Sequence, residues 1–350
     1  MGFDLYRYSL PRRRPLALKG TTLRRREGLL LRLSGDDGSE GWGETVPLPG
    51  FSEENLDQAI AQLRRLEGSL IGREVTDDWT DREGTFGREL ERIAPVPSVR
   101  FGLELAVWNL YGAFSGMSLS EVVPVNGLLS GSPSEALEEA RRMKDAGYQT
   151  VKLKVGGRGV EEDVGLVRRL CDELGDDMSL RLDANRAWSY EEAARFVRDA
   201  PSFEYIEEPL ADPARLPDLV LEFGAVVALD ESLVGLQPEE LEKHGYARGV
   251  VLKPTLLGGI SRTLRMAEHA LRLGMTPVLS SAYESGVGTA GLVALAAGIG
   301  ECPAPAGLDT YRALAGDVLD TPLALPAPSV DVGETMNASR TVDVSKLREI

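Results

Sequence analysis

The segment Thr150-Val151-Lys152-Leu153-Lys154-Val155 has the alternating pattern of a β-strand, and residues 160–174 after it have helical periodicity. This strand-then-helix unit recurs along the rest of the chain. Compact units of this kind predict parallel strands joined by right-handed helical crossovers. The predicted strands are 150–155, 179–183, 203–207, 226–230, 249–253 and 277–280, and the helices that follow them are 160–174, 189–199, 212–223, 237–244, 259–273 and 285–299.

At least six such units favour a closed α/β barrel of the TIM type over an open, doubly wound sheet. An open nucleotide-binding sheet would be supported by a G-x-G-x-x-G turn after an early strand, and the sequence has none. Gly156-Gly157 follows a strand but lacks the Lys-Ser/Thr pair of a phosphate-binding loop. We therefore expect a barrel domain over residues 116–310.

The two ends of the chain differ from this repeat. Residues 1–115 have an α+β pattern and are expected to cap the barrel. The tail, 311–350, is rich in Pro, Asp and Val, shows no clear helix, and is expected to pack back on the capping domain. Loops 11–22 and 46–52 are expected to cover the barrel mouth. The predicted strands of the cap are 3–9, 29–33 and 40–45, and its predicted helices are 53–67, 79–93 and 99–114.

The composition is that of an acidic protein of 350 residues, with a formal net charge of −16 and an isoelectric point near 4.8. A nucleic-acid partner is disfavoured, because phosphate binding requires a basic face. No apolar run is long enough to span a bilayer, and residues 1–15 lack the apolar core of a signal peptide. We expect a cytoplasmic protein with no membrane partner. The sequence carries no signal for an oligomeric state.

Cysteine and histidine are scarce in this sequence. Cys171 and Cys302 form no C-x-x-C pair, and His244 and His269 lie in helix-like charged stretches. A disulfide framework, a thiolate metal site and a histidine-based catalytic triad are therefore disfavoured. Acid–base chemistry must come from carboxylates or lysines.

A charged or polar residue stands at the C-terminal end of each predicted strand. Successive positions are 23 to 29 residues apart, which is one strand–helix unit. Because the parallel strands of a barrel end at the same mouth, where barrel active sites lie, these side chains should converge. They are Lys152 with Lys154, then Asp183, Glu207, Asp230, Lys253 and Ser280.

Three carboxylates on neighbouring strand ends call for a cation, because repulsion in a buried pocket would otherwise raise their pKa values. The all-oxygen set of Asp183, Glu207 and Asp230 suits a hard ion such as Mg²⁺, with Mn²⁺ as a possible substitute. Zinc is disfavoured, since no His or Cys lies nearby in the sequence pattern.

Lysines flank these carboxylates on both sides. Lys152 and Lys154 are two residues apart and share one face of their strand, whereas Lys253 approaches from the far side. A nearby cation lowers the pKa of a lysine toward neutrality and makes it a usable base. A metal that holds a substrate carboxylate also stabilises the enediolate formed when the α-proton leaves. The set therefore predicts an enzyme that acts on a carbon acid.

These motifs resemble those of the enolase superfamily, specifically its muconate-lactonizing subgroup. The resemblance covers essentially the whole chain. It implies an N-terminal α+β capping domain with a (β/α)₇β barrel, in which Asp183, Glu207 and Asp230 bind Mg²⁺. The matching motifs are Val151-Lys152-Leu153-Lys154, Arg181-Leu182-Asp183-Ala184-Asn185, Ile206-Glu207-Glu208-Pro209, Leu229-Asp230-Glu231-Ser232 and Leu252-Lys253-Pro254.

Within the subgroup the chain looks most like the o-succinylbenzoate synthase family of menaquinone biosynthesis. That resemblance implies a hydro-lyase that converts a small carboxylate, 2-succinyl-6-hydroxy-2,4-cyclohexadiene-1-carboxylate, to 2-succinylbenzoate. The stretches that carry it are Gly41-Trp42-Gly43-Glu44, Pro47-Leu48-Pro49-Gly50-Phe51-Ser52, Pro97-Ser98-Val99-Arg100-Phe101-Gly102, Val125-Asn126-Gly127-Leu128-Leu129 and Gly307-Leu308-Asp309-Thr310.

The same resemblance implies a role for each lysine. Lys154 would remove the α-proton and then assist loss of the hydroxyl on the same face. Lys253 would act as a cation over the opposite face, and Lys152 would help to hold Lys154 at a suitable pKa. An N-acylamino acid racemase or dipeptide epimerase on this scaffold would instead use Lys154 and Lys253 as paired bases. Muconate cycloisomerisation is a weaker third interpretation.

The succinyl arm of such a substrate needs contacts of its own. Ser280 and the turn at Ser285 are placed to supply hydroxyls and helix N-terminal amides, which is a natural carboxylate site. Gly307 would add a backbone amide. Ordinary helix capping by Ser285 and a simple loop glycine at Gly307 are the alternatives.

Overall fold

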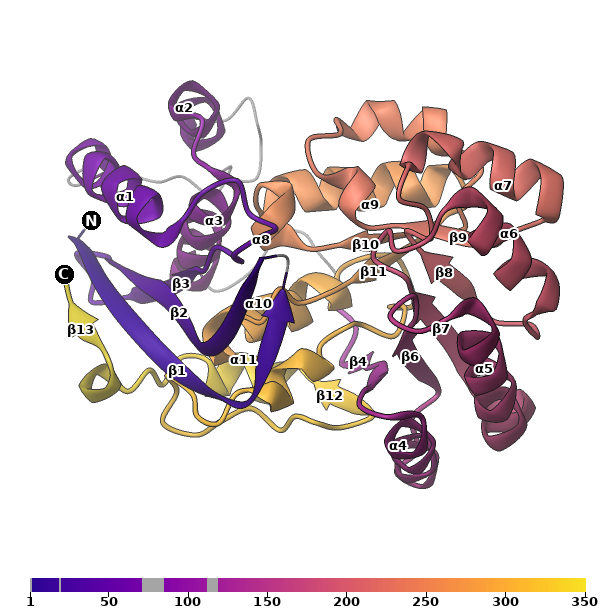
Figure 1. The fold of residues 1–350 in the computed structure, drawn as a ribbon. Coiled ribbons are helices and arrows are strands. Elements are labelled where there is room, and N and C mark those ends of the chain that lie inside the picture. Colours follow the sequence, from indigo (N-terminus) through magenta and orange to yellow (C-terminus); the bar gives the residue numbers. More distant parts are fainter. Residues whose placement is uncertain (1, 19, 71–84, 112–118) are drawn as a thin grey trace.

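The computed structural model describes residues 2–18, 20–70, 85–111 and 119–350. Figure 1 shows two parts, an antiparallel sheet with three helices on the left and a parallel sheet wrapped by helices on the right. Parts of two predicted helices, residues 79–84 and 112–114, lie outside the described residues.

The parallel sheet is a barrel, as expected. Within the described residues it has seven strands in sequential order from β5 to β11. The segment at Ala306 and Gly307 closes the ring, because Ala306 bridges to Val125 next to β5 and Gly307 bridges to Ser280 after β11. The strands are β5 (Gly127–Leu129), β6 (Thr150–Lys154), β7 (Ser179–Asp183), β8 (Tyr205–Glu207), β9 (Val227–Leu229), β10 (Gly249–Leu252) and β11 (Thr276–Leu279).

Helices cover the outside of the barrel (Figure 1). The predicted α-helix at 237–244 is a 3₁₀ helix, Pro238–His244. The first strand–helix unit, β5 with α4, had not been predicted, although Ser132 and Glu135 form a capping box at the start of α4. The α-helices are α4 (Pro133–Asp145), α5 (Val160–Leu174), α6 (Tyr190–Asp199), α7 (Leu216–Phe223), α8 (Pro254–Leu257), α9 (Ile260–Arg272) and α10 (Gly286–Ala297), and the other 3₁₀ helices are Gly175–Asp177, Pro213–Arg215, Glu231–Leu233, Asp309–Ala313 and Val344–Lys346.

The cap is built on a long hairpin, and here the expectation of a loop at 11–22 is wrong. The two strands run on almost to the turn, and the break in their register between Pro11 and Leu16 accommodates the residues that had suggested a loop. Gly20, with φ +75°, forms the turn. The elements are β1 (Gly2–Leu18), β2 (Thr21–Ser34), β3 (Glu40–Thr45), α1 (Leu56–Leu70), α2 (Thr85–Ile93) and α3 (Pro97–Tyr111).

Glycines in β3 let α3 lie directly on the cap sheet. A Cβ atom built on Gly43 would fall 1.9 Å from the carbonyl oxygen of Gly102, and one built on Gly41 would fall 2.1 Å from that of Ala106. Real side chains cannot approach a backbone so closely. The Gly-Trp-Gly motif is therefore a packing motif, and Trp42 between the glycines is buried in the core.

The C-terminal tail returns to both parts of the molecule. β12 (Ser329–Asp331) pairs with β4 (Val122–Pro124), and β13 (Arg348–Glu349) adds a short antiparallel strand to β1 of the cap. The expectation of a tail without a helix is wrong, because α11 (Val332–Ala338) begins at Asp331, whose side chain accepts from the amide of Glu334.

One large apolar core runs through cap and barrel, and a second, smaller cluster lies at the barrel mouth. Within the described ranges, no helix is both long and apolar enough to cross a membrane.

Candidate active site

The strand-end residues meet at one edge of the barrel sheet. Lys154 on β6 is in register with Asp183 on β7, and Asp183 is in register with Glu207 on β8. Asp230 follows β9 directly and Lys253 follows β10. The structure thus brings together the predicted catalytic lysines and the predicted metal ligands.

Two of the lysines are ion-paired with the carboxylates. Lys152 Nζ lies 2.5 Å from Glu207 Oε2 and 2.9 Å from Asp183 Oδ2. Lys253 Nζ contacts Asp230 Oδ2 directly. The three carboxylates are buried, with exposures of 8%, 1% and 5% for Asp183, Glu207 and Asp230. The cluster is therefore a desolvated array in which each charge depends on its neighbours.

Burial and charge shift the pKa values in opposite directions. Burial raises the pKa of the Glu207 carboxyl to about 7, even though Lys152 opposes the shift. Burial acts in the same sense on Asp183, but the charges of Lys152 and Lys253 outweigh it and hold its pKa below the ordinary value. The carboxylates raise the pKa of Lys152 and of Lys253 despite burial.

Lys154 differs from the other two lysines. It is exposed at the end of β6, and among the residues that the structure describes no carboxylate pairs with its ammonium group. It is therefore the lysine of the set whose amine is accessible to a substrate.

A fully buried carboxylate, Glu208, holds the backbone that carries Asp230 in place. Its oxygens accept from the amides of Asp230 at 3.0 Å and Ser232 at 2.8 Å, and from Arg186 Nε at 2.9 Å. Glu208 and Arg186 both have positive φ, 39° and 60°, which is strained for residues with a side chain. Sequence analysis missed this positioning role. Its only sequence signal is the adjacency of Glu208 to Glu207.

The donor set fits a hard divalent ion, because three buried carboxylates converge and a fourth lies beside them. Glu231 is partly buried, and its Oε2 has no hydrogen-bond partner in the described part of the chain. As the side chains stand, no group of three His, Cys, Asp or Glu residues in the described part of the chain is ready to hold a metal. Lys152 Nζ lies against both Asp183 and Glu207 in this arrangement.

The predicted substrate-binding residues differ in their availability. The hydroxyl of Ser280 has no hydrogen-bond partner within the described ranges. Ser285 is fully buried, and its hydroxyl donates to Glu44 Oε2 at 2.7 Å. The amide of Gly307 donates to the carbonyl of Leu279, which closes the barrel. The hydroxyl of Ser285 and the amide of Gly307 are thus already hydrogen-bonded within the protein. Of these three residues, Ser280 alone keeps a polar group without a partner among the described residues.

An apolar wall borders the mouth. It joins the tip of the cap hairpin and the 46–52 loop to the segments that follow β10 and β11. The cap segments 11–22 and 46–52, which were expected to cover the mouth, therefore both contribute to this wall. We call this cluster the mouth wall; its residues are Leu18, Leu23, Leu48, Phe51, Leu256, Ala282 and Tyr283.

Comparison with known proteins gives two family matches. The family described as "Enolase C-terminal domain-like" matches residues 135–336, and the family described as "MenC, N-terminal domain" matches residues 2–110.

Two similar curated proteins share a name. The o-succinylbenzoate synthase of Pasteurella multocida is 34% identical over 337 residues, covering 93% of this chain and 93% of that protein. The o-succinylbenzoate synthase of Haemophilus influenzae is 34% identical over 336 residues, covering 94% of this chain and 96% of that protein.

Solved structures share the fold at lower identity. The muconate lactonizing enzyme from Pseudomonas fluorescens has a TM-score of 0.84 and 24% identity, covering 99% of this chain and 97% of its own. The L-Ala-D/L-Glu epimerase from Bacillus subtilis has a TM-score of 0.83 and 21% identity, covering 95% of both chains.

Proposed function

This chain belongs to the o-succinylbenzoate synthase family of the enolase superfamily, and we propose that it dehydrates 2-succinyl-6-hydroxy-2,4-cyclohexadiene-1-carboxylate to 2-succinylbenzoate. The observation that carries the proposal is the pairing of an accessible lysine, Lys154, with a half-buried, ion-paired lysine, Lys253, on either side of three carboxylates. Elimination on one face of a ring requires one base and one fixed cation, and this pair of lysines offers both.

Lys154 is the proton-transfer group in this proposal. Its Nζ would accept the proton α to the ring carboxylate and then return it to the departing hydroxyl on the same face, so that water leaves and the ring becomes aromatic. Lys253, held by Asp230, would remain charged and stabilise the anionic intermediate from the other face. Lys152 would supply positive charge beside Asp183 and Glu207.

Membership in the superfamily implies a divalent metal, and we propose Mg²⁺, with Mn²⁺ as a substitute, held by Asp183, Glu207 and Asp230. The ion would supply positive charge at the substrate carboxylate. The proposal also includes a role in menaquinone biosynthesis, which the match to the MenC N-terminal domain family supports, and a cytoplasmic location.

The second candidate is racemisation or epimerisation of an N-acylamino acid or dipeptide. The observation in its favour is that Lys154 and Lys253 flank the carboxylates as two bases would. The curated relatives that are 34% identical over 93% and 94% of this chain are, by contrast, named o-succinylbenzoate synthases. We therefore rank dehydration first.

One experiment separates the two reactions. The purified protein with Mg²⁺ would be given the cyclohexadiene substrate, and in parallel N-succinylamino acids and dipeptides in D₂O. We expect dehydration with kcat/KM at least ~10²-fold above that of any deuterium exchange, because specific sites discriminate at that level. Rapid deuterium exchange into an amino acid, with no dehydration, would replace the proposal by the racemase reading.

A further inference from the structure

Arg26 on β2 is a buried arginine with an unusual set of partners. It is 2% exposed. Its Nη1 donates to the carbonyl of Pro47 at 2.6 Å and its Nη2 to that of Val46 at 2.6 Å. Its Nη2 and Nε also donate to the carbonyls of Ala282 and Tyr283, each at 3.1 Å. One guanidinium therefore holds four backbone carbonyls.

The hydrogen bonds of Arg26 go to the backbone and not to a carboxylate. Burial lowers the pKa of Arg26, the charges of Glu284 and Glu44 oppose that shift, and among the described residues no carboxylate oxygen accepts a hydrogen bond from the guanidinium group. A buried guanidinium whose hydrogen bonds go to carbonyls is placed to fix the backbone segments that carry them. A planar fork of five donors is suited to holding several acceptors in a fixed relation, which an ammonium group cannot do.

The carbonyls belong to two segments that are far apart in the sequence. Val46 and Pro47 lead into the 46–52 loop of the cap, whereas Ala282 and Tyr283 follow β11 and the free hydroxyl of Ser280 at the barrel mouth. Both segments contribute to the mouth wall. Arg26 thus connects the two halves of that wall, and we call this connection the staple. The cap half is Leu18, Leu23, Leu48 and Phe51, and the barrel half is Leu256, Ala282 and Tyr283.

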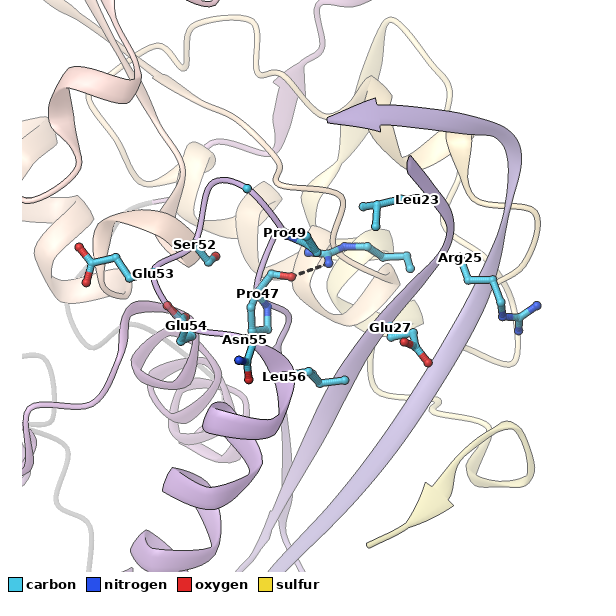
Figure 2. Close-up of a pocket in the computed structure, with 12 residues that line it drawn as sticks. Leu23, Arg25, Glu27, Pro47, Pro49, Ser52, Glu53, Glu54, Asn55 and Leu56 are labelled. Carbon is cyan, nitrogen blue, oxygen red and sulfur yellow. Dashed lines mark hydrogen bonds between the residues drawn. The ribbon is translucent and has the colours of Figure 1, made fainter. Parts of the chain in front are cut away.

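The cap half of the wall contains a compact turn. Its turn is closed on itself, because the amide of Ser52 donates to the carbonyl of Leu48 at 2.8 Å and the amide of Leu48 donates to Ser52 Oγ at 2.9 Å. A pocket of about 380 Å³ lies beside it, lined by Arg26, Pro47, Pro49 and Gly50 among others. Figure 2 shows the bond at Pro47 that ties the loop beside this pocket. Without the staple, the loop has room to shift.

The barrel half of the wall is strained where the staple holds it. Tyr283 has φ +65°, an uncommon backbone state for a tyrosine. Hydrogen bonds to the carbonyls of Ala282 and Tyr283 favour this conformation over relaxed alternatives.

We propose that Arg26 is a positioning residue that fixes the spacing between the cap and barrel halves of the mouth wall, and so sets how tightly the non-reacting arm of the substrate is held. The proposal rests on the proposed function for the identity of that arm. Arg26 touches no reacting group, so its loss should weaken binding more than it slows proton transfer.

The test compares Arg26→Ala and Arg26→Lys with Arg32→Ala. Arg32 lies on the same strand and pairs with Asp4 and Glu40 on the cap, far from the wall segments in its contacts. We expect Arg26→Ala to lower kcat/KM by ~10²-fold, mainly through KM, and added guanidinium ion to restore KM in that variant alone. Arg26→Lys should fall between wild type and Arg26→Ala. Arg32→Ala should keep the wild-type KM.

Hydrogen exchange gives a second readout that needs no substrate. In Arg26→Lys, which keeps the buried charge, the amides of 46–52 and 280–285 should exchange faster while the rest of the barrel is unchanged. If these amides exchange faster in Arg26→Lys but the wild-type protein does not dehydrate the substrate, the proposed function is rejected and the positioning role of Arg26 stands. Wild-type KM in folded Arg26→Ala, no rescue by guanidinium, or unchanged exchange in both segments would each overturn the role of Arg26.

Discussion

The Nζ atom of Lys152 lies 2.5 Å from Oε2 of Glu207, so an ammonium on β6 is bound to a carboxylate on β8, two strands away. Lys154 is two residues further along β6 and makes no such pair among the described residues. The two lysines of one motif therefore have different surroundings. Lys152 lies within the carboxylate cluster, whereas Lys154 is exposed.

Replacing Lys154 by alanine should remove activity without weakening the fold. The expected loss in kcat is ~10²–10⁴-fold, the usual contribution of a general base. The unfolding free energy should change by no more than about 0.5 kcal/mol, since the side chain is exposed and unpaired. Steady-state kinetics and urea unfolding measure the two quantities, with Lys144→Ala as the control. Turnover at the wild-type rate would remove Lys154 from the mechanism.

Replacing Lys152 by methionine should act mainly on stability. The change leaves Asp183 and Glu207 buried without their cation, which costs about 3 kcal/mol or more when one partner of a buried pair is removed. Added Mg²⁺ should recover more stability in this variant than in wild type, because the carboxylates then lack any other counterion. Thermal melts with and without Mg²⁺ would show it. Equal stability of variant and wild type without the ion would contradict this account of Lys152.

Stability should also depend on pH through Glu44. Burial raises the pKa of the Glu44 carboxyl from 4.5 to about 7, while Tyr8 and Ser285 donate to it and Glu284 lies near. Because the folded state keeps a proton that the unfolded chain releases, the Glu44 contribution is complete below pH 4.5 and is lost as the pH rises to about 7. The full contribution of Glu44 to the unfolding free energy is about 3 kcal/mol.

Glu44→Gln is the matched variant for that pH dependence, since it cannot titrate. Urea unfolding across the window should give a smaller decline in stability with rising pH than in wild type. The same decline in both proteins would show that Glu44 is not its source.

The packing of α3 on the cap predicts a sharp contrast between two glycines. Gly43→Ala places a methyl group 1.9 Å from the carbonyl oxygen of Gly102 and should cost about 3 kcal/mol or more. Gly68 lies in α1, and apart from its chain neighbours and the helix backbone no heavy atom of the described residues lies within 4 Å of a built Cβ, so Gly68→Ala should be neutral or stabilising by up to about 1 kcal/mol. Urea midpoints compare them. Similar midpoints for the two variants would refute the close approach of α3.

Much of the barrel could be predicted from the sequence because a charged or polar residue marks the C-terminal end of each predicted strand. Asp183 and Glu207 each end a short predicted strand, and one predicted helix separates successive strands. The first unit was missed because β5 is only Gly127–Leu129, too short to show alternation. The hairpin was misjudged at Pro11, since a proline in a strand is acceptable only where the register breaks, and a single sequence does not show where that is.

The charged residues at the strand ends could be predicted from the sequence, but the residues that hold the surrounding backbone in place could not. Lys154 and Asp183 lie at positions that the fold class itself makes notable. Arg26, Glu44 and Glu208 act through hydrogen bonds to backbone atoms of segments 20 to 257 residues away. Nothing in their own sequence neighbourhoods encodes those partners, so only the folded chain shows them.

The most direct test of the central claim is the absorbance change of 2-succinyl-6-hydroxy-2,4-cyclohexadiene-1-carboxylate on addition of the protein, first stripped of metal by a chelator and then supplied with Mg²⁺. We predict no turnover before Mg²⁺ is added, and rapid loss of the cyclohexadiene absorbance with formation of 2-succinylbenzoate after it. Stable absorbance in the presence of Mg²⁺ and Mn²⁺, with a protein shown to be folded, would contradict the account.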